Sequence, residues 1–164
     1  MSELYYLDFQ SPIGAVEIIG TPDGISSVLF KEEDVLVHLP GPETPQVLMD
    51  CLKELTEYFK GERMHFTVPL ISEGTEFQWK VWQALKNIRY AETASYREVA
   101  DAVGSPKAVR AVGNANSKNK ISIIVPCHRV IGSNGKLTGY AGSLSRKEWL
   151  LQHEQAVKHQ QTIV

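Results

Sequence analysis

Residues 95–115 have the sequence SYREVADAVGSPKAVRAVGNA, which is the pattern of two short helices joined by a tight turn. Ser95 and Glu98 have the spacing of a capping box, in which each side chain bonds to the backbone N–H of the other residue. This spacing predicts a helix that ends before Gly104, because glycine suits the left-handed turn after a helix. The pair Ser105-Pro106 is typical of a helix start, so we predict that the second helix begins there.

The two expected helices form a helix-turn-helix, which is either a DNA-binding motif or an ordinary helical hairpin. Two features favour DNA. Ala108 and two further alanines give the second helix a small surface that can approach a partner closely, and its polar face carries Lys107 and Arg110. The spacing alone fits both interpretations equally well.

Another helix is predicted before this motif, because Thr75 and Gln78 also have capping-box spacing. We interpret Trp79 and Trp82 as packing residues beside its apolar stripe. That stripe consists of Phe77, Val81, Leu85 and Ile88.

A last helix is predicted after the motif, where Ser145 and Glu148 repeat the capping-box spacing. Leu144 and Trp149 could then pack against each other as a hydrophobic staple at the helix start. We expect this helix to end near Val157.

The first thirty residues predict short strands, because runs of β-branched and aromatic residues alternate with turns that contain proline and glycine. The expected strands, which would form an antiparallel meander, cover residues 4–9, 15–19 and 25–30. A helix should follow, with Thr44 as its cap and Pro45 at its first position, and end at Gly61. Cys51 lies beside the apolar stripe of this helix and is interpreted as a buried packing residue.

The 164-residue chain has a formal net charge of −2, but the charge is divided unevenly. Residues 1–75 carry 4 lysines and arginines against 13 aspartates and glutamates, a net charge of −9. Residues 76–164 carry 13 against 6, a net charge of +7. We predict an N-terminal domain over residues 1–74 and a C-terminal domain over residues 75–164, and we expect the basic C-terminal domain to meet any polyanionic partner.

Several classes of protein are not expected from this sequence. No stretch of about 18 apolar residues occurs, and the first residues do not have the pattern of a signal peptide. Cys51 and Cys127 lie in dissimilar surroundings, which favours a reducing, cytoplasmic location over a disulfide framework. The histidines and cysteines do not have metal-ligand spacing, so we expect no metal, and we expect no cofactor.

Residues 121–130 have the sequence ISIIVPCHRV, which places a cysteine directly after an apolar run. We predict that residues 121–125 form a buried strand or extended segment that ends at the proline. Cys127 would then be a thiol on a rigid element, and cationic neighbours would favour its reactive thiolate. Neighbours in an extended chain face opposite ways, so His128 could reach the sulfur through a water, and Arg129 could be structural. A buried cysteine without reactivity fits the same pattern.

Residues 124–132, IVPCHRVIG, strongly resemble the active-site signature of the O6-alkylguanine-DNA alkyltransferases, and the likeness covers residues 75–155. Other segments resemble the family in family order: Ser95-Tyr96, 106–113, Asn119, Thr138-Gly139-Tyr140 and 147–151. The resemblance implies an α/β fold class, with an N-terminal ribonuclease-H-like α/β domain packed on a C-terminal helical domain. The C-terminal domain would contain a helix-turn-helix of the winged-helix type.

The resemblance also implies a reaction, which is DNA repair by direct reversal. Cys127 would irreversibly accept one alkyl group from O6-alkylguanine, and by the same chemistry from O4-alkylthymine, as a single-turnover methyltransferase. His128 would act through a water as the base toward Cys127, and Glu154 would orient His128. Tyr96 would help to protonate the leaving guanine, and Asn119 would brace the turn before the active-site segment.

The implied partner is double-stranded DNA that contains O6-alkylguanine, bound through its minor groove with the damaged base rotated out of the helix. Arg110 would fill the vacated space, and Ala108 would belong to the same DNA-contacting helix. Tyr140 would form an aromatic wall of the base pocket, and the backbone carbonyl of Val130 would bind the exocyclic amine of guanine. We expect a monomer and no membrane association; assembly of several copies along DNA stays open.

Two other functions are compatible with parts of this pattern. One is a non-catalytic module that binds alkylation lesions, in which tryptophan stands where the cysteine would be; Cys127 argues against it. The other is a cysteine hydrolase with a Cys127-His128 dyad, in which Arg110 would have no role.

The sequence resembles the stand-alone bacterial members of the family, because we find in it neither a zinc-ligand set nor a further repair domain. Thr138 and Ala141 lie at positions that vary near the pocket mouth of the family, so the tolerated alkyl size stays open.

Overall fold

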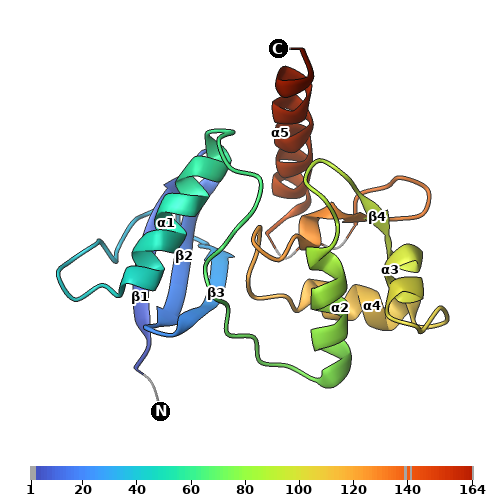
Figure 1. Cartoon of the computed structure of the whole chain (residues 1–164), viewed down its shortest axis with the longest axis horizontal. Coiled ribbons are helices and arrows are strands. Elements are labelled where there is room, and N and C mark those ends of the chain that lie inside the picture. The colour runs from blue at the N-terminus through green and yellow to red at the C-terminus, as the bar shows by residue number, and fades with distance from the viewer. Residues whose placement is uncertain (1–2, 139, 141, 164) are drawn as a thin grey trace. The chain divides into compact units, whose positions relative to one another are not determined.

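The computed structural model describes residues 3–138, 140 and 142–163 (Figure 1). The chain divides into two compact units, Met1–Ser72 and Glu73–Val164. The first unit contains a three-stranded sheet and one long helix, and the second is mainly helical. Within the described residues, no helix combines the length and the apolar character needed to cross a membrane.

The sheet of the first unit is an antiparallel meander in the order β1-β2-β3, as the strand and turn pattern predicted. Its strands are β1 (Tyr5–Ser11), β2 (Gly14–Thr21) and β3 (Gly24–Phe30). The inward side chains Leu7, Ile18 and Val28 are fully buried. Gly14 has a φ of 123°, which explains the glycine at the turn between β1 and β2.

Helix α1 (Gln46–Phe59) lies against this sheet (Figure 1) and buries the predicted packing residue Cys51. Burial raises the pKa of the Cys51 thiol to about 12, and the charge of Glu54 adds to the effect. The cap predicted at Thr44 is wrong. Pro45 is the N-cap and not the first helical residue, and the Thr44 hydroxyl accepts a hydrogen bond from the backbone N–H of Gly41 instead.

In the second unit, helix α2 (Glu76–Lys86) starts at the predicted capping box of Thr75 and Gln78. The packing interpretation is confirmed for Trp82, which is buried and donates from Nε1 to the carbonyl of Ala115 at 2.9 Å. It is wrong for Trp79, which is 51% exposed. Only part of the predicted apolar stripe is buried: Val81 and Leu85 are buried, whereas Phe77 and Ile88 are only partly buried.

The helix-turn-helix consists of α3 (Tyr96–Ala102) and α4 (Val109–Ser117), and α3 follows the short strand β4 (Ala94–Ser95). The capping box at the start of α3 is present, and Gly104 has the expected positive φ of 77°. Helix α4 begins later than predicted. The four residues before it form a turn, closed by a hydrogen bond from the N–H of Ala108 to the carbonyl of Ser105.

The apolar run before Cys127 is buried, but it is a series of turns rather than the predicted strand or extended segment. Backbone groups within the run bond to one another: the N–H of Val125 donates to the carbonyl of Ile121. Ile123 has a φ of 71°, which is a turn conformation and not a strand conformation. The run leads into the 3₁₀ turn η1 (Cys127–Arg129) and strand β5 (Val130–Ile131), which pairs in parallel with β4.

The last helix, α5 (Leu144–Ile163), starts two residues earlier than predicted, because a cap at Ser145 would have made Arg146 the first helical residue. The hydroxyl of Ser143, not of Ser145, accepts a hydrogen bond from the backbone N–H three residues later. Leu144 is 50% exposed and lies inside the helix, so the predicted staple is wrong. The helix also continues past Val157, because no glycine or proline follows to end it.

Candidate active site

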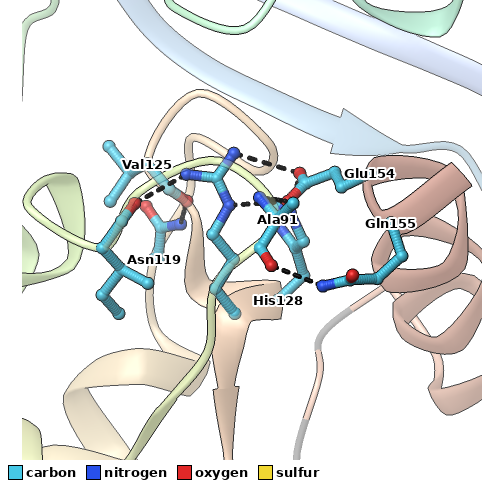
Figure 2. Close-up of polar contacts among 8 residues, drawn as sticks. Ala91, Asn119, Val125, His128, Glu154 and Gln155 are labelled. Carbon is cyan, nitrogen blue, oxygen red and sulfur yellow. Dashed lines mark hydrogen bonds and ion pairs between the residues drawn. The ribbon is translucent and has the colours of Figure 1, made fainter. Parts of the chain in front are cut away.

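The side chain of Asn119 holds together the turns that lead to Cys127. Its Nδ2 donates to the carbonyls of Ile121 at 3.2 Å and Val125 at 2.9 Å, and its Oδ1 accepts from the N–H of Ile121 at 3.0 Å. Figure 2 shows the amide of Asn119 beside Val125. Asn119 is buried, so these three bonds replace the sheet partners that a strand would have had.

Cys127 is the first residue of η1 and is only 2% exposed. Its N–H donates to the carbonyl of Val125 at 2.7 Å, and its carbonyl accepts from the amide of Asn116 at 3.4 Å. Burial raises the pKa of the Cys127 thiol to about 11, and this effect is opposed by the Asn119 amide and by the charge of Lys147. The buried thiol therefore needs a base to take its proton before the sulfur can attack.

The two residues after Cys127 both contact the carboxylate of Glu154 on α5. The Nε2 atom of His128 lies 2.7 Å from Glu154 Oε2 (Figure 2). Arg129 donates from Nε to Oε1 at 2.9 Å and from Nη2 to Oε2 at 3.0 Å. The extended geometry predicted for this segment is wrong, because residues 127–129 form a 3₁₀ turn that directs both side chains to one acceptor.

Burial and charge together determine the protonation of this cluster. Burial alone would raise the pKa of Glu154, but the hydrogen bonds and charges of His128 and Arg129 hold this pKa well below its usual range. Burial lowers the pKa of His128 against the opposing effect of Glu154. An ionised carboxylate can only accept hydrogen bonds, so Nε2 of His128 carries the proton and Nδ1 has a lone pair. Nδ1 is buried and has no hydrogen-bond partner among the described residues.

Glu154 also holds the segment that leads into β4. The backbone N–H of Ala91 donates to Glu154 Oε1 at 3.1 Å, and the side-chain amide of Gln155 donates to the carbonyl of Ala91 (Figure 2). Ala91 has a φ of 64°, a left-handed conformation that is costly for a residue with a side chain. These contacts from α5 stabilise it, so one carboxylate links His128 to the chain that enters the helix-turn-helix.

Lys147 is a fully buried cation that sequence reasoning did not assign to the site. Its Nζ donates to the carbonyl of Thr138 at 2.7 Å, and the hydroxyl of Tyr96 donates to the same carbonyl at 3.1 Å. Burial lowers the pKa of Lys147 to about 8, although the nearby Cys127 acts in the opposite direction. Lys147 therefore places positive charge near the thiol.

A periodic pattern in the sequence could have indicated this burial. Lys147, Leu150, Glu154 and Val157 recur at helical spacing, and all four are buried along one side of α5. An ionisable residue on an otherwise buried stripe is a signal for a functional or paired group.

Two residues expected at the base pocket are buried near Cys127. Val130 is fully buried, and its backbone N–H donates to the carbonyl of Cys127. Tyr140 is 8% exposed, and burial together with the charge of Cys127 raises its pKa well above the usual range. Ala141, expected near the pocket mouth, lies outside the described residues.

The residues expected to meet DNA lie on the helix-turn-helix. Arg110 is the second residue of α4 and is exposed, as is Lys107 in the turn before it. Ala108 is the N-cap of α4 and is partly buried. Tyr96, the first residue of α3, is also partly buried. The four residues therefore lie at the start of the two helices, outside the fully buried His128 cluster.

Family comparisons match both units of the chain. The DNA-binding domain of 6-O-methylguanine DNA methyltransferase matches residues 76–156, and the ribonuclease-like domain of the same protein matches residues 4–71. The methylated-DNA–protein-cysteine methyltransferase of Methanosarcina acetivorans is 49% identical over 153 residues, which cover 92% of this chain and 98% of that protein. The constitutive methyltransferase of the same name from Bacillus subtilis is 48% identical over 157 residues, 92% of this chain and 94% of that protein.

Solved structures give the same result. The O6-methylguanine methyltransferase of Mycobacterium tuberculosis has a TM-score of 0.83 and 42% identity, covering 94% of each chain. A structure of the M. tuberculosis OGT protein in complex with DNA has a TM-score of 0.82 and 45% identity, covering 93% of each chain. The chain belongs to the 6-O-methylguanine DNA methyltransferase family, which confirms the predicted family and the predicted α/β fold class with an N-terminal sheet domain and a C-terminal helical domain.

Proposed function

We propose that this protein repairs DNA by transferring an alkyl group from O6 of a guanine to Sγ of Cys127, once per molecule. The observation that carries the proposal is the buried Cys127 followed directly by the His128–Glu154–Arg129 cluster. The curated relatives are named methylated-DNA–protein-cysteine methyltransferase, which supports the same chemistry. O4-alkylthymine offers an equivalent alkyl–oxygen bond and is a second substrate.

The reaction begins with the proton of the Cys127 thiol. The lone pair on Nδ1 of His128 accepts this proton through a water, and the sulfur displaces the alkyl carbon in line with the bond to O6. One S–C bond forms and one C–O bond breaks. Tyr96 helps to protonate the leaving guanine, and the proton taken up by His128 is released through water to restore Tyr96. One proton therefore passes in total from sulfur to guanine, and both side chains return to their starting states. The thioether that results is stable, and the protein is used once.

Access to the buried sulfur requires the damaged base to leave the DNA helix. A stacked base cannot bring its O6 atom to a side chain that is 2% exposed, and rotating it out costs a few kcal/mol. Helix α4, which starts after Ala108, enters the minor groove, and Arg110 fills the space that the base leaves. Tyr140 forms a wall of the pocket, and the carbonyl of Val130 binds the exocyclic amine of guanine.

We infer further that the protein acts as a monomer on double-stranded DNA in the cytoplasm, where thiols stay reduced. A module that only binds lesions is not favoured, because such a module has no use for a cysteine with an adjacent base. Asn119 holds the turn before Cys127 through three hydrogen bonds, which supports a site built to keep the sulfur in one position.

The decisive experiment measures the mass of the protein after incubation with excess duplex DNA that carries O6-methylguanine. We expect the mass to rise by one methylene group, with the modification mapped to Cys127 and intact guanine left in the DNA. Cys51→Ala is the control and should be methylated as fully as the wild type. Several repair events per molecule, or lesion binding without methylation, would contradict the proposal.

A further inference from the structure

We propose that Arg129 is a positioning residue that keeps His128 as a neutral imidazole, with the proton on Nε2 and the lone pair on Nδ1. The inference rests on the proposed function, because it concerns the base that takes the proton from Cys127. Arg129 itself does not touch the reacting atoms in this arrangement. It acts through Glu154, which it shares with His128.

The guanidinium of Arg129 donates a hydrogen bond from each of its three nitrogens in the interior. It makes two hydrogen bonds to Glu154, and its Nη1 donates to the carbonyl of Ile88 at 2.8 Å. It lies 5.5 Å from the centre of the Tyr90 ring, and Arg129 is only 6% exposed. The guanidinium is a cation, so this site contains one positive charge balanced by the carboxylate of Glu154.

That balance determines which form of His128 is stable. If His128 were also protonated, two cations would share one carboxylate in a fully buried site, and Lys147 on α5 would add further repulsion. An uncompensated buried charge is costly, so the proton stays off. Without the guanidinium, a protonated His128 would balance the charge of the Glu154 carboxylate, because the Ala91 N–H that also donates to Glu154 is neutral.

Besides Lys147, the other titratable groups that the structure describes next to this cluster are uncharged. Cys127 on the same turn and Tyr140 both have a raised pKa and are uncharged at neutral pH. Burial likewise raises the pKa of Tyr90, beside Arg129, to about 12. Of the two cations that oppose protonation of His128, Arg129 has a larger effect than Lys147.

A purely structural role for Arg129 makes a different prediction. If the hydrogen bonds of Arg129 only held η1 against Ile88 and Glu154, removing the side chain would lower the stability of the protein without changing the titration of His128. A lysine at this position keeps the charge but cannot form the two parallel bonds. Arg129→Lys should therefore separate the effect of the positive charge from the effect of the hydrogen bonds to Glu154 and Ile88.

The experiment is NMR of histidine-labelled protein without DNA, with His128 assigned from a His128→Asn variant. In the wild type at pH 7, we expect the ring nitrogens to report a neutral imidazole with hydrogen on Nε2. In Arg129→Gln, the His128 pKa should rise by about one to three units, and Arg129→Lys should stay close to the wild type. Arg63→Gln, which breaks ion pairs with Glu54 and Glu57 in the first unit, should leave His128 unchanged.

Two results would overturn the proposal. One is a wild-type His128 that is protonated, or carries its proton on Nδ1, at pH 7; this test stands even if Arg129→Gln does not fold. The other is a folded Arg129→Gln with an unchanged His128 titration. The readout uses no DNA, so a failed alkyl transfer in the mass experiment would refute the proposed function separately.

Discussion

The ammonium of Lys147 lies 6.0 Å from the centre of the Tyr96 ring, and both side chains donate to the backbone carbonyl of Thr138. This carbonyl belongs to the loop that precedes Tyr140. One buried cation therefore joins that loop to the first helix of the helix-turn-helix, and its charge also acts on Cys127. The loop, the helix-turn-helix and the thiol are coupled through Lys147.

Replacing Lys147 by methionine should change how stability depends on pH. The pKa of Lys147 is about 8 in the folded chain, below its usual value, so between pH 8 and 10 the unfolded chain binds more protons than the folded chain. The free energy of unfolding of the wild type minus that of Lys147→Met should therefore increase as pH rises, by at most about 1.4 kcal/mol per pH unit. Urea unfolding at pH 8 and pH 10 measures this, and equal slopes for the two proteins would refute it.

The same variant should slow alkyl transfer. The charge of Lys147 lowers the pKa of Cys127, so its removal reduces the thiolate fraction. Each unit of increase in that pKa reduces the fraction about tenfold. Single-turnover transfer from a methylated duplex at pH 7 measures the effect, with the exposed Lys80→Met as the control. A Lys147→Met variant that is folded and reacts at the wild-type rate would show that the charge does not assist the sulfur.

Glu154→Gln should destabilise the protein at neutral pH, because it leaves Arg129 buried without its carboxylate. Breaking a buried ion pair costs about 3–5 kcal/mol. The pKa of Glu154 is depressed in the folded chain, so its stabilising effect is complete above about pH 4.3, the ordinary glutamate value. As pH falls below that value, the advantage of the wild type over Glu154→Gln should shrink. Thermal or urea unfolding at pH 7, 5 and 3 checks this; a gap that widens on acidification would contradict it.

Cys127→Ser should abolish alkyl transfer while lesion binding remains, because an alcohol of similar size is a far weaker nucleophile than a thiol. Labelled transfer and gel-shift assays on the same DNA separate the two properties. Cys51→Ala is the matched control: its cavity should cost about 1–2 kcal/mol of stability but leave transfer intact. Residual labelling of Cys127→Ser would place the acceptor on another residue.

Arg110→Ala should weaken the capture of alkylated duplex by about tenfold or more without changing stability, because Arg110 is exposed. Lys107→Ala offers a contrast on the same motif: a phosphate contact should weaken damaged and undamaged DNA alike. Binding to both duplexes at physiological salt tests the difference. If Arg110→Ala captured the lesion as well as the wild type, its role in filling the vacated space would be wrong.

Local patterns were sufficient for much of the fold. The capping boxes at Thr75 and Ser95 were predicted because their hydrogen bonds involve residues only three positions apart. The start of α4 was predicted too early, because a Ser-Pro pair is equally compatible with the turn that precedes Val109. The segment before Cys127 was assigned as extended from its β-branched residues, but the side chain of Asn119 holds it in turns.

The sequence by itself determined the family and the two helices of the helix-turn-helix, and it indicated Cys127 as the proposed nucleophile, because these depend on residue types at short, fixed spacings. The family resemblance already paired Glu154 with His128, but only the tertiary structure added Arg129 to the same carboxylate and buried Lys147 near the thiol. Glu154 lies 25 positions from Arg129 in the sequence and meets it when α5 packs on η1. Short sequence patterns therefore indicated Cys127, whereas long-range packing determines the electrostatic environment of its thiol.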